Sequence, residues 1–341
     1  MEFFADYAGF LAKTATLVVA IVVVLLTFAV LRKGRARAPE GHLEVHKLND
    51  FYKAMRQRLE ASLLSKDSLK ALRKREAKEA KAARRSEEAL PRVFVLDFDG
   101  DLKASAVENL RHEITALLML ATPQDEVVVR LESGGGMVHG YGLASSQLAR
   151  IRQAGVPLTV CVDKVAASGG YMMACVGDKV LSAPFAILGS IGVVAQLPNV
   201  HRLLKKHDVD IEMLTAGEYK RTLTVLGENT EKGRQKFQEE LETTHELFKN
   251  FVARYRPQLA VDEVATGEVW LGVAALGKQL VDQLSTSDEY LAERAKSAEL
   301  FHLRFAHKKT LPERLGMAAS TAVEHLATKG WSGLNAQRFW Q

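Results

Sequence analysis

The chain has 341 residues, of which 47% are hydrophobic and 26% are charged, and it carries a net charge of +5. This composition is sufficient for a packed core and excludes a wholly disordered chain. The basic residues crowd between Arg32 and Arg85, directly after an apolar run. That position favours a membrane surface or a topology signal over a nucleic-acid-binding face.

The first predicted element is a membrane anchor at residues 14–31, an uncharged run of Val, Leu, Ile and Ala without a helix breaker. At 1.5 Å per residue, such a run reaches about 27 Å, close to the hydrocarbon thickness of a bilayer. Its acidic start and basic exit differ from a cleaved signal peptide. The exit is formed by Arg32, Lys33, Arg35 and Arg37, and the positive-inside rule therefore predicts a cytoplasmic location for the rest of the chain.

The next segment, residues 50–89, is dominated by Ala, Lys, Arg and Glu. Acidic and basic residues often stand three or four positions apart, which predicts a solvated helix that acts as a linker or stalk. An RNA-binding helix is the lesser alternative, because no aromatic residues are interleaved with the charges.

From Arg92 onward the pattern changes to short apolar strands that alternate with helices, which predicts an α/β domain with a largely parallel sheet. Residues 281–283 are expected to close the core. The expected strands are residues 92–100, 126–131, 158–162, 180–182, 187–194 and 211–214, and the expected helices are residues 106–120, 137–153, 171–176 and 230–256.

Three other features of the sequence have structural interpretations only. Residues 180–200 are uncharged, but two prolines and two glycines interrupt them, so they are not a membrane span. Residues 311–327 predict an amphipathic helix in a C-terminal tail. Cys161 and Cys175 stand in apolar sequence without metal-ligand spacing, which predicts two small buried side chains.

A glycine-rich loop follows the strand at residues 126–131, with the sequence Glu132-Ser133-Gly134-Gly135-Gly136. Glycines allow the backbone to approach a ligand closely and to direct N–H groups at it. A plain tight turn is the alternative.

The second candidate segment is Ala166-Ala167-Ser168-Gly169-Gly170-Tyr171. Ser168 stands among small residues at the start of a predicted helix, where unpaired N–H groups suit a nucleophile whose attack creates an oxyanion. An ordinary helix N-cap is the alternative.

The third candidate is Lys220, in the segment Ala216-Gly217-Glu218-Tyr219-Lys220-Arg221. A lysine acts as a base only where burial or a nearby cation such as Arg221 disfavours its charge, and an exposed lysine is the alternative. No Ser-His-Asp set competes with this pair. His139 has no Asp placed to orient it, and His245 stands in a polar helix where we expect it to be exposed.

The three segments together, in this order, resemble the signal peptide peptidase A family of serine peptidases. Ser168 precedes Lys220 by 52 residues, and the residues around Ser168 match the family's small-small-Ser-Gly-Gly-Tyr motif. A further match, Gly189-Ser190-Ile191-Gly192, implies that Ser190 orients the lysine. The loop departs from the family's usual Asn-Ser-Pro-Gly-Gly, because Gly134 replaces the proline, which makes the loop more flexible.

This resemblance implies a Ser168–Lys220 dyad with an oxyanion hole formed by the N–H groups of Gly136 and Gly169. It also implies a Clp-protease/crotonase-like spiral of β-β-α units, a homo-oligomeric ring, and peptide substrates in or near the bilayer of a bacterial inner membrane. No cofactor, metal or nucleic acid is implied. Relatives often have their catalytic domains on the outer face, in contrast to the charge rule.

Two other functions are compatible with the same fold. A crotonase-like acyl-CoA enzyme would need carboxylates over a thioester, and only Glu132 is near the glycine loop. An inactive membrane scaffold would leave Ser168, Lys220 and Ser190 unexplained. The expected organisation is an anchor at residues 1–37, a charged linker at 38–90, a peptidase domain at 91–300 and a tail at 301–341.

Overall fold

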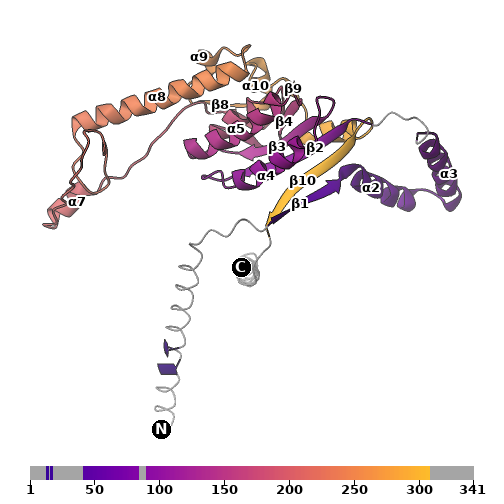
Figure 1. The fold of residues 1–341 in the computed structure, drawn as a ribbon, viewed down its shortest axis with the longest axis horizontal. Helices are drawn as coiled ribbons and strands as arrows, with labels where there is room; N and C mark the ends of the chain where they lie inside the picture. Colours follow the sequence, from indigo (N-terminus) through magenta and orange to yellow (C-terminus); the bar gives the residue numbers. More distant parts are fainter. Residues whose placement is uncertain (1–12, 15, 18–40, 84–89, 308–341) are drawn as a thin grey trace, which may run out of the picture. The chain divides into compact units, whose positions relative to one another are not determined.

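The computed structural model describes residues 13, 14, 16, 17, 41–83 and 90–307 (Figure 1). The residues from Leu43 to Phe305 form one compact unit. Apart from three positions of the anchor, the expected helices at residues 14–31 and 311–327 lie outside the described residues. Within the described ranges, no helix combines the length and the apolar character that crossing a membrane requires.

A ten-stranded sheet forms the centre of the described chain, and its main path is parallel from β10 to β9. Three short strands branch from the carboxyl end of β3, where β5 pairs with β3 and β7, and β7 pairs antiparallel with β8. The main path runs in the order β1 (Gly41–Lys47), β10 (Glu299–His307), β2 (Arg92–Gly100), β3 (Glu126–Ser133), β4 (Leu158–Val162), β6 (Lys179–Ser182) and β9 (Gln283–Leu284). The branch strands are β5 (Val165–Ala167), β7 (Ile187–Gly189) and β8 (Val269–Leu271).

Both faces of this sheet are buried. Successive side chains of a strand point to opposite faces, so neighbouring residues of one strand enter two different cores. Along β2, Phe94 and Leu96 belong to the larger core, whereas Val93 and Val95 belong to a smaller core on the other face. A sheet that is covered on both faces needs nearly continuous apolar strands, and this explains the pattern from which the parallel sheet was predicted.

More helices contribute side chains to the larger core than to the smaller core. The larger core receives side chains from α4 (Val107–Leu118), α5 (Val138–Gln153), α6 (Gly169–Ala174) and α8 (Glu231–Tyr255). The smaller core receives Leu48 and Tyr52 of α2 (Leu48–Leu63) and Leu291 of α11 (Ser287–Arg294). The remaining helices are α3 (Lys66–Ala83), α7 (His201–Lys206), α9 (Val261–Val264) and α10 (Gly272–Gly277).

Most of the predicted elements are confirmed, with two differences after residue 92 and one before it. Residues 211–214 are not a strand: they pair with no strand, and Ile211, Met213 and Leu214 are exposed. The strand predicted at residues 187–194 ends at Gly189, because Gly189 and Ser190 have positive φ angles that leave the extended region. The charged segment forms two helices, α2 and α3, and residues 84–89 lie outside the described chain.

Residues 194–230, here called the arm, lead away from the sheet and return to it through α8 (Figure 1). The side chain of Asn199 joins the outgoing and the returning segments of the arm, because its Nδ2 donates to the carbonyl oxygens of Thr224 at 2.9 Å and Gly227 at 3.0 Å. Thr230 caps α8 by accepting a hydrogen bond from the Gly233 N–H at 3.1 Å. The first turns of α8 therefore carry the arm, and its later turns pack on the sheet.

Candidate active site

The glycine loop at the end of β3 is held by hydrogen bonds from its own strand. Ser133 Oγ accepts from the Gly135 N–H at 3.0 Å and lies 2.6 Å from the hydroxyl oxygen of Tyr141. Gly135 has a φ of 88°, and a Cβ at Gly136 would lie 2.2 Å from the carbonyl oxygen of Leu102. Because the Gly135 N–H is already bonded, the N–H of Gly136 is the candidate oxyanion donor of this loop.

Ser168 follows β5 and precedes α6, and its backbone is in a conformation that non-glycine residues rarely adopt. Its φ is 52° and its ψ is −120°, and its N–H donates to the Gly189 carbonyl at 2.8 Å. The side chain makes no capping hydrogen bond to α6, so Ser168 is not an ordinary N-cap. A strained residue between two ordered elements is typical of functional sites, where the backbone directs a side chain toward a ligand.

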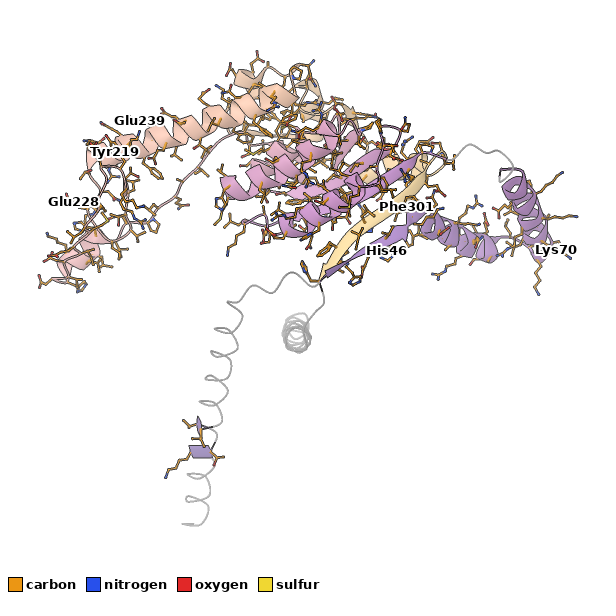
Figure 2. The ribbon with its side chains drawn as sticks, in the orientation of Figure 1. His46, Lys70, Tyr219, Glu228, Glu239 and Phe301 are labelled. Atoms are coloured by element: carbon orange, nitrogen blue, oxygen red, sulfur yellow. The ribbon has the colours of Figure 1, made fainter. Side chains whose placement is uncertain are left out.

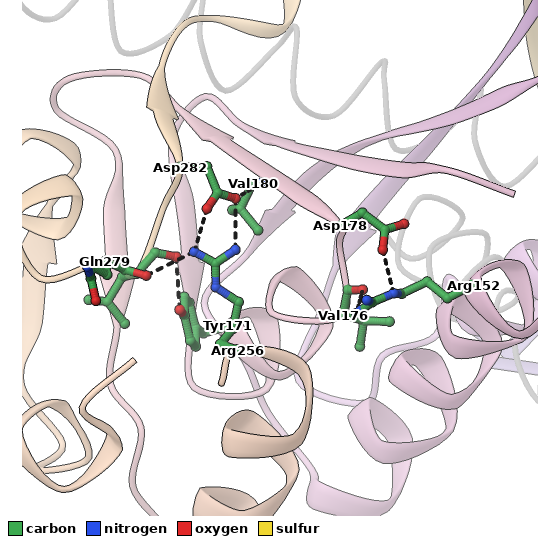
Figure 3. Close-up of polar contacts among 9 residues, drawn as sticks. Arg152, Tyr171, Val176, Asp178, Val180, Arg256, Gln279 and Asp282 are labelled. Carbon is green, nitrogen blue, oxygen red and sulfur yellow. Dashed lines mark hydrogen bonds and ion pairs between the residues drawn. The ribbon is translucent and has the colours of Figure 1, made fainter. Parts of the chain in front are cut away.

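Buried polar contacts fix α6 behind Ser168 (Figure 3). Tyr171 donates its hydroxyl hydrogen to the Leu280 carbonyl at 2.9 Å, and burial raises the pKa of this tyrosine well above its ordinary value. Arg256, only 2% exposed, contacts both carboxylate oxygens of Asp282 at 2.8 Å. Asp282 also accepts from the Val180 N–H at 2.7 Å. These contacts connect α6, the end of α8 and β6, and so hold the position of Ser168.

Two hollows meet at Ser168. The wider one, of about 870 Å³, is lined by Gly136, Ser168, Ser190 and His245 among others. The narrower one, of about 360 Å³, also includes Gly169 and is otherwise mainly apolar. Its apolar lining comes from α5, α6 and α8, and includes Val138, Met172, Leu247, Phe248 and Phe251. The structure therefore places the predicted nucleophile, both predicted oxyanion donors and Ser190 around one site.

Ser190 is held in a second strained turn beside the site. Its φ is 49°, and its N–H donates to the Glu268 carbonyl at 2.6 Å. The neighbouring residue, Ile191, accepts at its carbonyl from His245 Nε2 at 3.1 Å if that nitrogen carries the proton. The expectation that His245 is exposed is therefore wrong: it is half-buried and lines the wider hollow. His139 is exposed.

Lys220 is the predicted site residue that the structure does not bring to these hollows. It is exposed in the arm, and among the described residues it lines neither hollow. Its neighbour Tyr219 lies under the amines of Lys232 and Lys236, in the first turns of α8 (Figure 2). The hollows instead touch α8 from Thr244 onward, about 18 Å along the helix axis from Lys232 at 1.5 Å per residue.

Glu132 lies on the other face of the sheet end, away from Ser168. It is exposed and pairs with Lys164 at 2.8 Å, and it lines a separate hollow with Asp97, Asp99 and Asp163. Within the described ranges, no group of three His, Cys, Asp or Glu side chains has the arrangement of a metal site. The carboxylate that an acyl-CoA enzyme would need is thus not among the described residues that line the Ser168 hollows.

Two family models match consecutive parts of the chain: peptidase family S49 N-terminal at residues 2–148 and peptidase family S49 at residues 150–300. The chain belongs to peptidase family S49. This confirms the resemblance inferred from the motifs, and it makes the protein a peptidase by family. The match to the second model contains Ser168, Ser190 and Lys220.

The S49 relatives include proteins named as proteases. A probable protease SohB of Haemophilus influenzae is 60% identical over 231 residues, which are 68% of this chain and 65% of that protein. A probable protease SohB of Buchnera aphidicola is 46% identical over 314 residues, which are 92% of this chain and 93% of that protein. A putative signal peptide peptidase SppA of Enterococcus faecium is 28% identical and covers 62% of this chain and 60% of its own length.

Proposed function

We propose that this peptidase is a membrane-anchored serine endopeptidase, with Ser168 as nucleophile and Lys220 as general base, on a Clp-protease/crotonase-like spiral. The observation that carries the proposal is the strained backbone of Ser168 at the junction of an apolar hollow and a glycine loop. Such a position leaves the hydroxyl available to a substrate instead of to the helix that follows.

In this reaction the Ser168 oxygen attacks the peptide carbonyl, and the proton of its hydroxyl passes to a neutral Lys220 amine. The N–H groups of Gly136 and Gly169 stabilise the developing oxyanion. The lysine then gives the proton to the leaving amine, and a water molecule hydrolyses the acyl-enzyme. Ser190, which lines the same hollow as Ser168, orients the lysine.

Lys220 reaches Ser168 from the arm of a second copy of the chain. Two observations support this arrangement: the part of the arm that holds Lys220 does not line the Ser168 hollows of its own chain, and the arm exposes several large apolar side chains. Leu203, Val209 and Leu214 are 57%, 44% and 93% exposed. An arm that docks on the next copy makes a head-to-tail contact, and repeated contacts of this kind form a ring when their rotation closes.

The substrates are remnants of signal peptides or other small membrane-associated peptides. The apolar hollow beside Ser168 suits an apolar side chain next to the scissile bond, and the name of the Enterococcus relative points to the same substrate class. Residues 14–31 anchor the protein in the inner membrane, with the peptidase on the cytoplasmic side. A C-terminal reporter tests the side: phosphatase activity in the periplasm would overturn it.

Labelling with a fluorophosphonate tests the proposed chemistry. The full chain in detergent should bind the probe covalently, the Ser168→Ala variant should not, and Lys220→Arg should label far more slowly because a guanidinium stays charged. Equal labelling of the wild-type chain and Ser168→Ala would exclude Ser168 as the nucleophile. Equal labelling of the wild-type chain and Lys220→Arg would exclude the dyad and leave the nucleophile in place.

A further inference from the structure

Helix α2 has an apolar stripe that the protein covers only at its beginning. Leu48 and Tyr52 pack against the smaller core, on the face of the sheet opposite the Ser168 site. Further along the helix Met55, Leu59 and Leu63 are 47%, 62% and 73% exposed. Residues four apart lie on one face of a helix, so these three continue the stripe beyond the edge of the core.

Two arginines border the exposed part of this stripe. At 100° per residue, Arg56 and Arg58 fall on opposite sides of the line through Met55 and Leu59. Arg56 pairs with Glu60 at 3.1 Å and also with Glu76 of α3, so the two helices are joined on the Arg56 side. An apolar stripe with long basic side chains at its margins is typical of a helix that lies in the plane of a membrane interface.

Helix α3 adds positive charge next to this stripe. It contains seven Lys or Arg residues and three Asp or Glu residues. Lys70 points away from the rest of the unit and is exposed (Figure 2). A net positive helix beside an apolar stripe matches a surface that is both apolar and negatively charged.

We propose that α2 and α3 form a membrane-contact surface, in which Met55, Leu59 and Leu63 enter the interface of a bilayer that contains anionic lipids. The charge favours lipid over a second copy of this chain, because two copies would bring two positive α3 helices together. The choice of a bilayer rests in part on the proposed anchor, which would keep α2 near the membrane, because the apolar run ends at Leu31 and α2 begins at Leu48. This surface goes beyond the proposed peptidase activity and does not involve Ser168.

Depth-dependent quenching on the full chain tests this surface. The protein carries Leu59→Cys with an environment-sensitive fluorophore and is reconstituted in vesicles of phosphatidylcholine and phosphatidylglycerol with nitroxide-labelled lipids. The matched control is Ala61→Cys, an exposed position about 200° further around the same helix. Burial raises the pKa of the native Cys161 and Cys175 thiols to about 12, so they do not compete for the label.

The fluorophore at position 59 should be quenched at least about twofold more than the fluorophore at position 61, because only the stripe enters the interface. The difference should shrink in vesicles of phosphatidylcholine alone and in high salt. Equal quenching at the two positions would overturn the proposal. Disulfide-linked dimers formed by the unlabelled Leu59→Cys protein under oxidising conditions, together with no quenching of the labelled protein, would also overturn it, because the stripe would then meet a second copy. An alkaline wash reports the anchor separately, since only protein without a membrane span is removed.

Discussion

At the scale of residues, the position of Ser168 depends on neighbours that have no side chain. A Cβ at Gly169 would lie 2.4 Å from the ring of Tyr141, and a Cβ at Gly170 would lie 2.4 Å from the carbonyl oxygen of Ser133. The first turn of α6 therefore packs directly on α5 and on the end of β3. This close approach explains why two glycines follow the serine in the motif.

Gly170→Ala should destabilise the fold by about 1–3 kcal/mol, because the new methyl group has to displace backbone atoms of β3. Gly142→Ala is the matched control, since no atom lies within 4 Å of its Cβ position in α5. That control should be neutral or stabilising by up to about 1 kcal/mol, because alanine favours a helix over glycine. Thermal unfolding in detergent measures both, and a Gly170→Ala variant as stable as the control would contradict the close contact.

His245 should act as a positioning residue for the turn that contains Ser190. His245→Phe removes the donor to the Ile191 carbonyl, and a lost hydrogen bond of about 1 kcal/mol should lower kcat about fivefold with little change in KM. His245→Gln retains an N–H donor and should recover most of the activity. If the two variants are equally impaired, the ring has another role, such as proton transfer, and the pH profile of the glutamine variant would then differ from that of the wild-type chain.

At the scale of elements, α8 has two tasks at its two ends. Its first turns carry the arm, and its last turn ends at Arg256, which is buried and paired with Asp282. The apolar face between them lines the narrower hollow. The helix thus connects the region that holds Lys220 with the region that holds Ser168.

Asp282→Asn should cost about 3 kcal/mol in the free energy of unfolding, because it leaves the buried Arg256 guanidinium without a carboxylate. Glu239→Gln is the control, since its pair with Lys236 lies on the exposed face of α8 with side chains 34% and 64% exposed. An exposed pair contributes at most about 1 kcal/mol. Comparable losses in the two variants would show that the Arg256 pair is not specially stabilising.

Asp125, in the connection between α4 and β3, makes the stability of the fold depend on pH. Burial would raise its pKa, but hydrogen bonds from Arg92 and Thr122 outweigh this and lower the pKa to about 2. The carboxylate therefore stabilises the fold at pH values above about 4, and this contribution is lost as the pH falls toward 2. Asp125→Asn should lower stability by about 2 kcal/mol at pH 7 and by much less at pH 2.5. A difference that does not change with pH would contradict this assignment.

The elements that could be predicted are those whose burial leaves a recognisable apolar pattern in the sequence. Strands β2, β3 and β4 are short apolar runs because both faces of the sheet are covered, and α5 begins where the glycine loop ends. Residues 211–214, which are apolar except for Glu212, resemble a strand in sequence but lie in the arm, where the described unit gives them no partner strand. The contact of His245 with the Ile191 carbonyl could not be predicted from the sequence either, because it depends on where a distant turn meets α8.

At the scale of the whole molecule, the candidate site has residues that meet in one unit and a predicted lysine, Lys220, that does not line the hollows of that unit. Ser168, Gly136, Gly169 and Ser190 meet in one unit, as the order of motifs predicted. The place of Lys220 could not be derived from sequence spacing, since spacing does not say which copy of the chain supplies a side chain.

Mixing two inactive variants tests this division. Ser168→Ala and Lys220→Ala should each be inactive alone. When they are co-expressed in equal amounts, about a quarter of the sites should contain both native residues if the contact is head-to-tail. Peptide hydrolysis should then recover to about that fraction. No recovery would place the lysine and the serine of each site on the same chain.

The order of the strands sets a constraint on synthesis at the ribosome. β10 lies between β1 and β2, yet it is the last strand of the described chain, and Glu299 of β10 pairs with Arg92 of β2 across more than 200 residues. Until β10 emerges, the edge of β2 has no partner on that side. A long apolar edge without a partner is prone to aggregation. The nascent chain therefore stays vulnerable until almost all of the peptidase unit has been translated, and shielding by a chaperone would matter most in that interval.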